Sequence, residues 1–253
     1  MAVEQITLAS VNTHFARALR TAGGLGEAAT ADILLLQELY DVQPNDKTAL
    51  INLGFSVISL QAHSGLGIAY REKSHVHPTE DVVRDRVLQS AGRFGIWGAQ
   101  RFADRPLDYT DHGILAAKFM SKGGSKFTVA VVHAPVVTSP FRRRHFLRNL
   151  SNELTDPYYS EQLILAGDMN HYPQQHRIDR VFQERAGLSL VRLAAPTWPS
   201  RYAGWLERFI GACRPGTLDD VMYRGHGLSA QKGDTYDLQS DHRAILATFH
   251  LTT

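Results

Sequence analysis

Cysteine is almost absent from this sequence of 253 residues, which contains only Cys213. A single cysteine cannot form an internal disulfide and leaves no cysteine-based metal site, so we expect a reducing, cytoplasmic compartment. Long apolar runs are also missing, because no stretch approaches the roughly 18 apolar residues that a membrane span needs. The N-terminus has no basic segment followed by an apolar one. We therefore expect a soluble protein that is not exported and has no membrane partner, and no protein partner is indicated.

A strong net charge is missing as well, since 27 Lys and Arg residues balance 25 Asp and Glu residues. This balance excludes a protein that coats nucleic acid through overall positive charge, although a local basic face remains compatible with it. Lysine is scarce, with 6 of the 27 cations against 21 arginines. The arginine excess suits bidentate recognition of phosphate, and a GC-rich genome is the alternative explanation.

No internal repeat or low-complexity linker divides the chain, so we expect one domain over residues 1–253. Short apolar runs rich in β-branched residues predict strands at 6–11, 33–36, 55–60, 66–70, 113–119, 127–132, 163–166, 218–223 and 244–249. The paired glycines within 122–125 predict a hairpin turn. Helical periodicity predicts helices at 15–29, 47–53, 141–154 and 178–186. This order indicates an α/β or α+β fold, with a mixed sheet or two packed sheets and helices outside.

Polar residues stand where several of these strands end. They are Asn12, Gln37, Glu38, His133, Asp168 and Asn170, and Asp241 and His242 precede the last strand. Strand ends that collect carboxylates, amides and imidazoles on one rim are how a sheet presents a site. Taken alone, each of these residues is more often structural, as an Asp after Gly is usually a turn residue. The co-occurrence of five such endings favours a functional site.

A metal site is the first function that these residue types suggest. Glu38 is a hard oxygen ligand of the kind that Mg²⁺ prefers. A Mg²⁺ ion with few protein ligands keeps waters and binds substrate phosphate. Asn12 and Asn170 offer amide oxygens and donors without adding charge. We therefore expect Mg²⁺, with Mn²⁺ as a substitute.

Proton transfer is the second function that the set suggests. His133 and His242 can donate to phosphate oxygens or move a proton near neutral pH. Asp168 is a candidate base that orients a water, and Asp219 or Asp241 could hold His242 in one tautomer. No Ser or Cys nucleophile signature accompanies them. The set therefore points to metal-assisted hydrolysis of a phosphate ester.

Along the chain these polar residues belong to a series of short segments, Ala9-Ser-Val-Asn12, Leu34-Leu-Leu-Gln-Glu38, Gly67-Ile-Ala-Tyr-Arg71, His133, Ala166-Gly-Asp-Met-Asn170, Thr197-Trp198, Leu218-Asp-Asp-Val221 and Ser240-Asp-His-Arg243. In this order the segments resemble the motifs of the endonuclease/exonuclease/phosphatase family, the deoxyribonuclease-I-like phosphoesterases. Gly-Asp-x-Asn or Ser-Asp-His alone is a common accident, whereas the ordered set covers nearly the whole chain. The resemblance implies a four-layer α/β sandwich, in which two central mixed sheets are flanked by helices and the site lies on one rim.

The resemblance also implies a role for each matching residue. Glu38 would be the principal Mg²⁺ ligand, with Asn12 and Asp241 in or near the metal shell. Asp168 would orient the attacking water. The phosphoryl oxygens would be bound by Asn170 and His133, and His242, held by Asp219, would act as acid/base or charge stabiliser at the scissile phosphate.

Three features depart from the family's pattern. Asp220 stands where Tyr or His is usual. His14 stands where abasic-site endonucleases often carry Asp, which disfavours that subgroup and a second metal ion. The segment 199–216 has no counterpart, and it is either a loop that faces substrate or a packed surface helix.

The substrate depends on loops, because this family cleaves many phosphate esters with one core. Phe141-Arg-Arg-Arg-His-Phe-Leu-Arg148 could contact a polyanion, although only Arg144 and Arg148 share a helix side and a solvated face is the alternative. A second basic group, Arg84, Arg86, Arg93, Arg101 and Arg105, is interleaved with Phe94, Trp97 and Phe102. It suits stacking on bases, and an ordinary core strand is the alternative. Arg101, Arg144, Arg148 and Trp198 are our candidate substrate contacts.

We carry three hypotheses for function. The first is a Mg²⁺-dependent phosphodiesterase that acts as a nuclease on DNA or RNA. The second is hydrolysis of a small soluble phosphate ester, which the near-neutral charge motivates. The third is a binding protein that has kept the fold and lost the chemistry, and the competent residue at every catalytic position counts against it.

Overall fold

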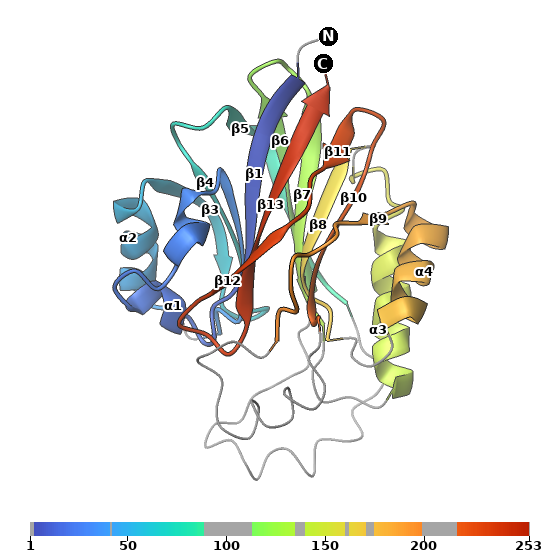
Figure 1. The fold of residues 1–253 in the computed structure, drawn as a ribbon, viewed down its shortest axis with the longest axis horizontal. Coiled ribbons are helices and arrows are strands. Elements are labelled where there is room, and N and C mark those ends of the chain that lie inside the picture. The colour runs from blue at the N-terminus through green and yellow to red at the C-terminus, as the bar shows by residue number, and fades with distance from the viewer. Residues whose placement is uncertain are drawn as a thin grey trace.

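The structure is a computed structural model that describes residues 3–40, 42–88, 113–134, 140–159, 162–170, 175–198 and 217–252. The side chains of 80–82, 140–144 and 175–179 are outside that description. Two β-sheets pack face to face, with α1 and α2 outside one sheet and α3 and α4 outside the other (Figure 1). These four layers confirm the α/β sandwich that the sequence predicted. No helix among these residues is long and apolar enough to cross a membrane.

The first sheet has the strand order β11-β13-β1-β2-β4-β3, and β12 pairs with β13. Its strands are β1 (Val3–Asn12), β2 (Ile33–Gln37), β3 (Phe55–Gln61), β4 (Leu66–Arg71), β11 (Leu228–Ala230), β12 (Asp234–Asp237) and β13 (Arg243–Thr252). The pairing of β1 with β2 is parallel, and all other pairings in this sheet are antiparallel. Strand β2 is buried along its whole length, as its unbroken apolar run predicts.

The second sheet has the strand order β5-β6-β7-β8-β10-β9. Its strands are β5 (Val76–Val87), β6 (Gly113–Ser121), β7 (Lys126–His133), β8 (Leu163–Asp168), β9 (Ser189–Leu190) and β10 (Asp219–Arg224). Here too one pair is parallel, β7 with β8, and the others are antiparallel. The predicted hairpin joins β6 to β7, with Gly124 at φ +88°.

The helices are α1 (Arg17–Arg20), the 3₁₀ helix η1 (Gly26–Thr30), α2 (Pro44–Asn52), α3 (Pro140–Glu153) and α4 (Gln175–Ala186). Three apolar clusters hold the layers together. One lies between the sheets and includes Leu35, Val131 and Phe249. Another lies between the second sheet and α3 and α4, and a third lies between the first sheet and α1, η1 and α2. Each sheet is therefore buried on both faces, which explains why its central strands are apolar on both sides.

The predicted helix at 15–29 is wrong. This stretch contains the four residues of α1, a turn and η1. Gly23 and Gly26 have φ values of +68° and +47°, which an α-helix cannot include. The apolar spacing therefore reflects burial against the first sheet rather than a continuous helix.

The predicted helix at 47–53 begins earlier, at Pro44. Proline suits the first helical position, and the Asp46 carboxylate accepts a hydrogen bond from the backbone N–H of Gln43 at 2.7 Å.

Four strands escaped the sequence prediction, namely β5, β9, β11 and β12. Strand β5 carries Arg84, Asp85 and Arg86 in succession, so its composition hides the alternating pattern of a strand. The other three have between two and four residues, which is too short for periodicity to detect.

A substitution at Gly167 on β8 can test how closely this strand approaches β7. It has φ +146°, and a Cβ there would lie 1.9 Å from the Val132 carbonyl oxygen on β7. We predict that Gly167→Ala lowers the free energy of unfolding by more than about 2 kcal/mol, because both the backbone conformation and the contact oppose a side chain. Urea unfolding followed by circular dichroism measures the change.

Gly124→Ala is the matched control. Gly124 also has positive φ, but a Cβ there would meet nothing within 4 Å. The control should therefore lose only about 1 kcal/mol, the cost of the left-handed conformation. Equal losses in the two variants would contradict the proposed close approach of the strands.

Candidate active site

The polar strand ends of the two sheets meet at one edge of the sandwich. In the first sheet Asn12 pairs with Gln37, and Glu38 follows β2. In the second sheet Asp168 lies between His133 on β7 and Asp219 on β10. Because β1 and β2 are parallel, as are β7 and β8, each pair of strands ends on the same side of its sheet. The register thus places the predicted catalytic residues at a single rim.

Asp168 lies at the centre of this rim. Its Oδ2 is 3.4 Å from Asn12 Nδ2, 3.9 Å from His133 Nε2 and 3.7 Å from His242 Nε2. Its Oδ1 accepts from the backbone N–H of Asn170 at 2.9 Å, which fixes the carboxylate plane. The side chain is 1% exposed. Three polar groups therefore converge on one buried carboxylate oxygen.

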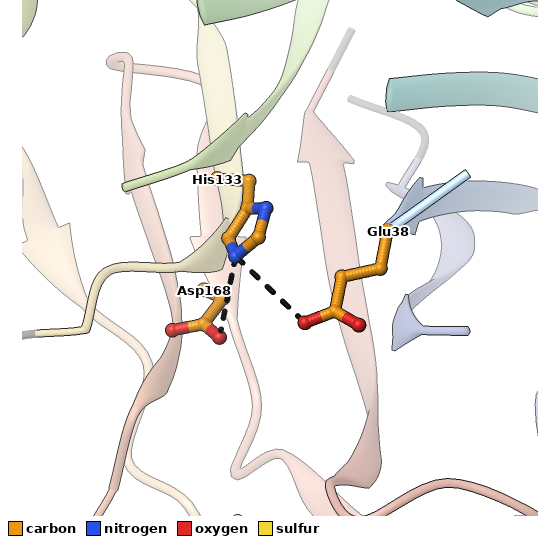
Figure 2. A group of neighbouring side chains, drawn as sticks. All are labelled: Glu38, His133 and Asp168. Atoms are coloured by element: carbon orange, nitrogen blue, oxygen red, sulfur yellow. Dashed lines mark ion pairs between the residues drawn. The ribbon is translucent and has the colours of Figure 1, made fainter. Parts of the chain in front are cut away.

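Figure 2 shows Glu38, directly after β2, pointing toward His133 on β7 and Asp168 on β8. His133 Nε2 lies 3.9 Å from an oxygen of each carboxylate. One ligand atom from each of the three residues falls within 4.8 Å of the others, as also holds for the group Asp168, Asp219 and His242. Carboxylates in such groups are oxygen donors of the kind that a divalent cation requires.

Asn12 separates the two carboxylates without adding charge. Its Nδ2 donates to Glu38 Oε1 at 3.0 Å and faces Asp168 Oδ2 at 3.4 Å, while its Oδ1 accepts from the His14 backbone N–H at 3.1 Å. Asn12 is 1% exposed, so all three contacts are shielded from solvent. An amide at this position joins the first sheet to the second.

His242 and Asp219 form a buried pair beside Asp168. The Nδ1–H of His242 donates to Asp219 Oδ2 at 2.7 Å, which leaves Nε2 facing Asp168. The residue types alone left open whether Asp219 or Asp241 holds this imidazole, the resemblance implied Asp219, and the geometry agrees with Asp219. Thr197 supports the pair, because its Oγ1 accepts the backbone N–H groups of Leu218 and Asp219 at 3.0 and 3.1 Å.

Burial and mutual charge shift the pKa values of these groups. Burial raises the pKa of the Glu38 carboxyl, with the charge of Asp241 adding to it and that of His242 opposing it. Burial, then the charge of Asp219, raises the pKa of the Asp168 carboxyl well above its ordinary value. Burial alone would lower the pKa of His242, but Asp219 and Asp168 hold it well above its ordinary value. The buried setting thus disfavours the charged forms of the Glu38 and Asp168 carboxyls and favours the charged form of His242.

His14 is a residue of the site that sequence reasoning noted only as a departure. Its Nδ1–H donates to Asp241 Oδ1 at 2.9 Å. Burial opposes ionisation of Asp241, but the hydrogen bond from His14 and the charge of His242 bring the pKa of Asp241 to about 2. Asp241 belongs to neither close ligand group among the described residues. Its place in the metal shell therefore stays a prediction.

Backbone strain is concentrated at the same rim. Among the residues that the structure describes, positive φ outside glycine occurs at His14, Phe15, Ala16, Glu38 and Asn170. The first three adjoin β1, and each has an L side chain for which the left-handed region is unfavourable. Hydrogen bonds hold them, since Thr13 Oγ1 donates to the Gln37 carbonyl at 2.7 Å and the Ala16 N–H donates to the Glu38 carbonyl at 3.2 Å. Such strain is typical of functional sites.

The structure describes the side chains of only two of the four predicted substrate contacts, Arg148 and Trp198. Arg101 lies outside the described residues, as does the side chain of Arg144. Arg148 is exposed on α3, and Trp198 is half-buried next to Thr197. Asn170, expected to bind phosphoryl oxygens, donates from Nδ2 to the Ala134 carbonyl at 2.8 Å and so anchors the chain after β7.

Arg84 is an internal structural residue rather than a free surface cation. Its two terminal nitrogens donate to the Asp156 carboxylate at 2.7 and 2.9 Å, and Nη2 lies 2.9 Å from Glu153 Oε1. The guanidinium also lies over the rings of Tyr158 and Tyr159. Arg84 therefore joins β5 to the end of α3. The acidic partners of this cation could not be read from its own stretch of sequence.

The two-sheet α/β sandwich has counterparts among solved structures of other proteins. No family model and no curated protein matches the chain. Among solved structures, an endonuclease/exonuclease/phosphatase family protein from Bacteroides thetaiotaomicron matches with TM-score 0.71 and 16% identity over 100% of both chains.

Two further structures have described ligands. The human Nocturnin catalytic domain with a bound sulfate anion matches with TM-score 0.63 and 17% identity over 99% of this chain and 97% of its own. The inositol polyphosphate 5-phosphatase domain of SPsynaptojanin, in complex with inositol (1,4)-bisphosphate and a calcium ion, matches with TM-score 0.61 and 16% identity. The match covers 99% of this chain and 85% of that domain. The chain therefore has the endonuclease/exonuclease/phosphatase fold, as the ordered motifs predicted.

Asn12 offers a direct test of the charge distribution. We predict that Asn12→Asp lowers the free energy of unfolding in EDTA by about 1–3 kcal/mol, because it removes a buried donor and adds a carboxylate beside Glu38 and Asp168. Urea unfolding measures the loss.

Asn12→Ala is the comparison variant, since it removes the donor and adds no charge. Its loss should be smaller than that of Asn12→Asp. If the aspartate variant proved as stable as the alanine variant, the carboxylates would not repel one another as inferred.

Proposed function

We propose that this protein is a Mg²⁺-dependent phosphoesterase that hydrolyses phosphodiester bonds, most simply as a nuclease on DNA or RNA. The observation that carries the proposal is the convergence of Glu38, Asn12, His133 and the Asp219–His242 pair around Asp168. Among the residues that the structure describes, no serine or cysteine belongs to that convergence, whereas its carboxylates and imidazoles suit water activation at a phosphate. The fold shared with Nocturnin and the inositol phosphatase domain agrees with this chemistry.

Glu38 and Asp168 fit a divalent cation. Burial raises the pKa of both carboxyls, and a bound cation would stabilise their charged forms. We assign Glu38 as the principal ligand, with Asn12 and Asp241 nearby. A bound Mg²⁺ would supply neutralisation of phosphoryl charge.

The chain's own residues divide the remaining tasks. Asp168 orients the attacking water with its buried Oδ2, and His133 donates toward the phosphoryl oxygens from the same side. The Asp219 carboxylate accepts from His242 Nδ1 and directs Nε2 to the reacting group, where it acts as acid/base or charge stabiliser. Asn170 holds the backbone after His133 and positions Asp168.

A small phosphate ester is the second candidate substrate. Arg84, one of the arginines that suggested a nucleic-acid surface, is paired with Asp156 and Glu153, and Arg86 Nε lies 3.7 Å from Glu153. These ion pairs neutralise Arg84 and Arg86, which leaves less positive charge to contact a nucleic-acid backbone. The exposed side chain of Arg148 favours the nuclease candidate instead.

The two candidates predict different substrate profiles. Purified protein is incubated with supercoiled plasmid, labelled DNA and RNA oligonucleotides, inositol phosphates and bis(p-nitrophenyl) phosphate, in Mg²⁺ or in EDTA. We expect Mg²⁺-dependent cleavage of a nucleic acid. If the protein hydrolysed the small esters and left the nucleic acids uncleaved, the second candidate would replace the first.

Asp168→Asn and His242→Gln are expected to lower turnover by about 10²–10⁴-fold, because each removes a positioned proton-transfer or water-orienting group. Asp234→Asn, an exposed substitution on β12, should leave turnover unchanged. Near-normal activity in either active-site variant would refute its assigned role.

Glu38→Gln tests the metal ligand separately. Replacing the charged oxygen by an amide should weaken Mg²⁺ binding by at least about 10-fold, as measured by calorimetric titration and by the Mg²⁺ concentration that gives half-maximal activity. Glu27→Gln, an exposed substitution on η1, is the matched control and should retain the original affinity. Unchanged binding in Glu38→Gln would move the metal away from this residue.

A further inference from the structure

Tyr40 contacts the catalytic rim from a position that no motif marks. It follows Glu38 by two residues, and its hydroxyl lies 2.9 Å from His133 Nδ1. The two rings are 6.1 Å apart between centroids and tilted by 45°. Tyr40 therefore touches the ring nitrogen of His133 that is turned away from the carboxylates.

The tyrosine ring is seated by its surroundings. Gly65, at φ +66°, faces it so closely that a Cβ there would lie 2.7 Å from the ring. The Leu39 N–H donates to the Gly65 carbonyl at 2.9 Å, which fixes the two segments relative to each other. Phe15 packs on the ring with centroids 6.1 Å apart. The hydroxyl is thus held in place by backbone as well as side-chain contacts.

The opposite side of the imidazole determines which nitrogen carries the proton. His133 Nε2 faces oxygens of Glu38 and Asp168, each at 3.9 Å (Figure 2). A lone pair on Nε2 would be repelled by both oxygens, whereas an N–H is attracted by them. In the neutral ring Nδ1 is then the acceptor, and the Tyr40 hydroxyl is its donor.

We propose that Tyr40 is a positioning residue for His133. Its O–H donates to Nδ1, holds the neutral ring in the Nε2–H tautomer and directs that N–H toward the place of the phosphoryl oxygens. The tautomer follows from the contacts above, and its use in binding phosphate rests on the proposed function.

The two histidines of the rim therefore differ in the hydrogen-bond partner of Nδ1. The carboxylate of Asp219 holds His242 Nδ1 at 2.7 Å, and a carboxylate stabilises a ring that gains a proton. A phenol hydroxyl holds His133 Nδ1, and as a donor it stabilises the neutral ring. His242 is suited to proton movement, and His133 is suited to act as a constant hydrogen-bond donor.

Nitrogen NMR of the full chain labelled with ¹⁵N-histidine tests the tautomer without any substrate. The His133 signals are assigned as those lost in His133→Gln. We expect an unprotonated Nδ1 and a protonated Nε2 in the wild type, and a mixture of tautomers in Tyr40→Phe. A wild-type ring protonated on Nδ1 would overturn the proposal.

Kinetics test the consequence for substrate. Loss of one neutral hydrogen bond in Tyr40→Phe should raise KM for the cleaved ester about 2- to 10-fold, with a smaller change in kcat. Tyr70→Phe, on β4 and in contact with Phe119, is the matched control and should leave the His133 signals and KM unchanged. Unchanged signals and KM in Tyr40→Phe would overturn the proposal.

Gly65→Ala gives an independent variant, because its methyl group must displace the tyrosine ring. A folded Gly65→Ala protein should reproduce the tautomer mixture of Tyr40→Phe, and a wild-type pattern would count against the proposal. If the wild type hydrolyses no phosphate ester, the proposed function fails, and the NMR result still decides the role of Tyr40.

Discussion

The close approach of buried carboxylates where two sheets meet is the constraint on which this site depends. Glu38 comes from the first sheet, and Asp168 and Asp219 come from the second. Their mutual repulsion and burial are unfavourable in themselves. The surrounding groups offset the repulsion, because Asn12 donates between two carboxylates and His242 pairs with Asp219. Carboxylates held in this way could bind a metal ion.

Rigidity at the rim follows from the same arrangement. A buried carboxylate that moves by a small distance loses its donors, so the chain around it must be held firmly. Left-handed conformations at Glu38 and Asn170 turn the chain directly after β2 and β8. The contact of Gly167 with Val132 brings β7 and β8 together just before His133 and Asp168. The sheets thus serve as the rigid base on which short, strained segments present the reactive groups.

Much of the fold was predictable because each central strand is a short apolar run that ends in a polar residue. Strands β1, β2, β7 and β8 all follow this pattern, and the residues at their ends form the observed rim. Prediction failed where the local pattern was ambiguous. The helical spacing at 15–29 reflects burial of a turn interrupted by glycines, and the charged residues of β5 concealed a long strand.

By itself, the sequence determined which residue types stand at the strand ends and, through their order, which fold they belong to. The tertiary structure shows the partners: Asp219 for His242, as the resemblance implied, and two that it alone decided, His14 for Asp241 and Tyr40 for His133. The physical reason is that these hydrogen bonds join residues 23, 227 and 93 positions apart, respectively. The geometry depends on how the two sheets pack for Asp219 with His242 and for Tyr40 with His133, and on the pairing of β1 with β13 for His14 with Asp241. No local pattern of residues carries that information.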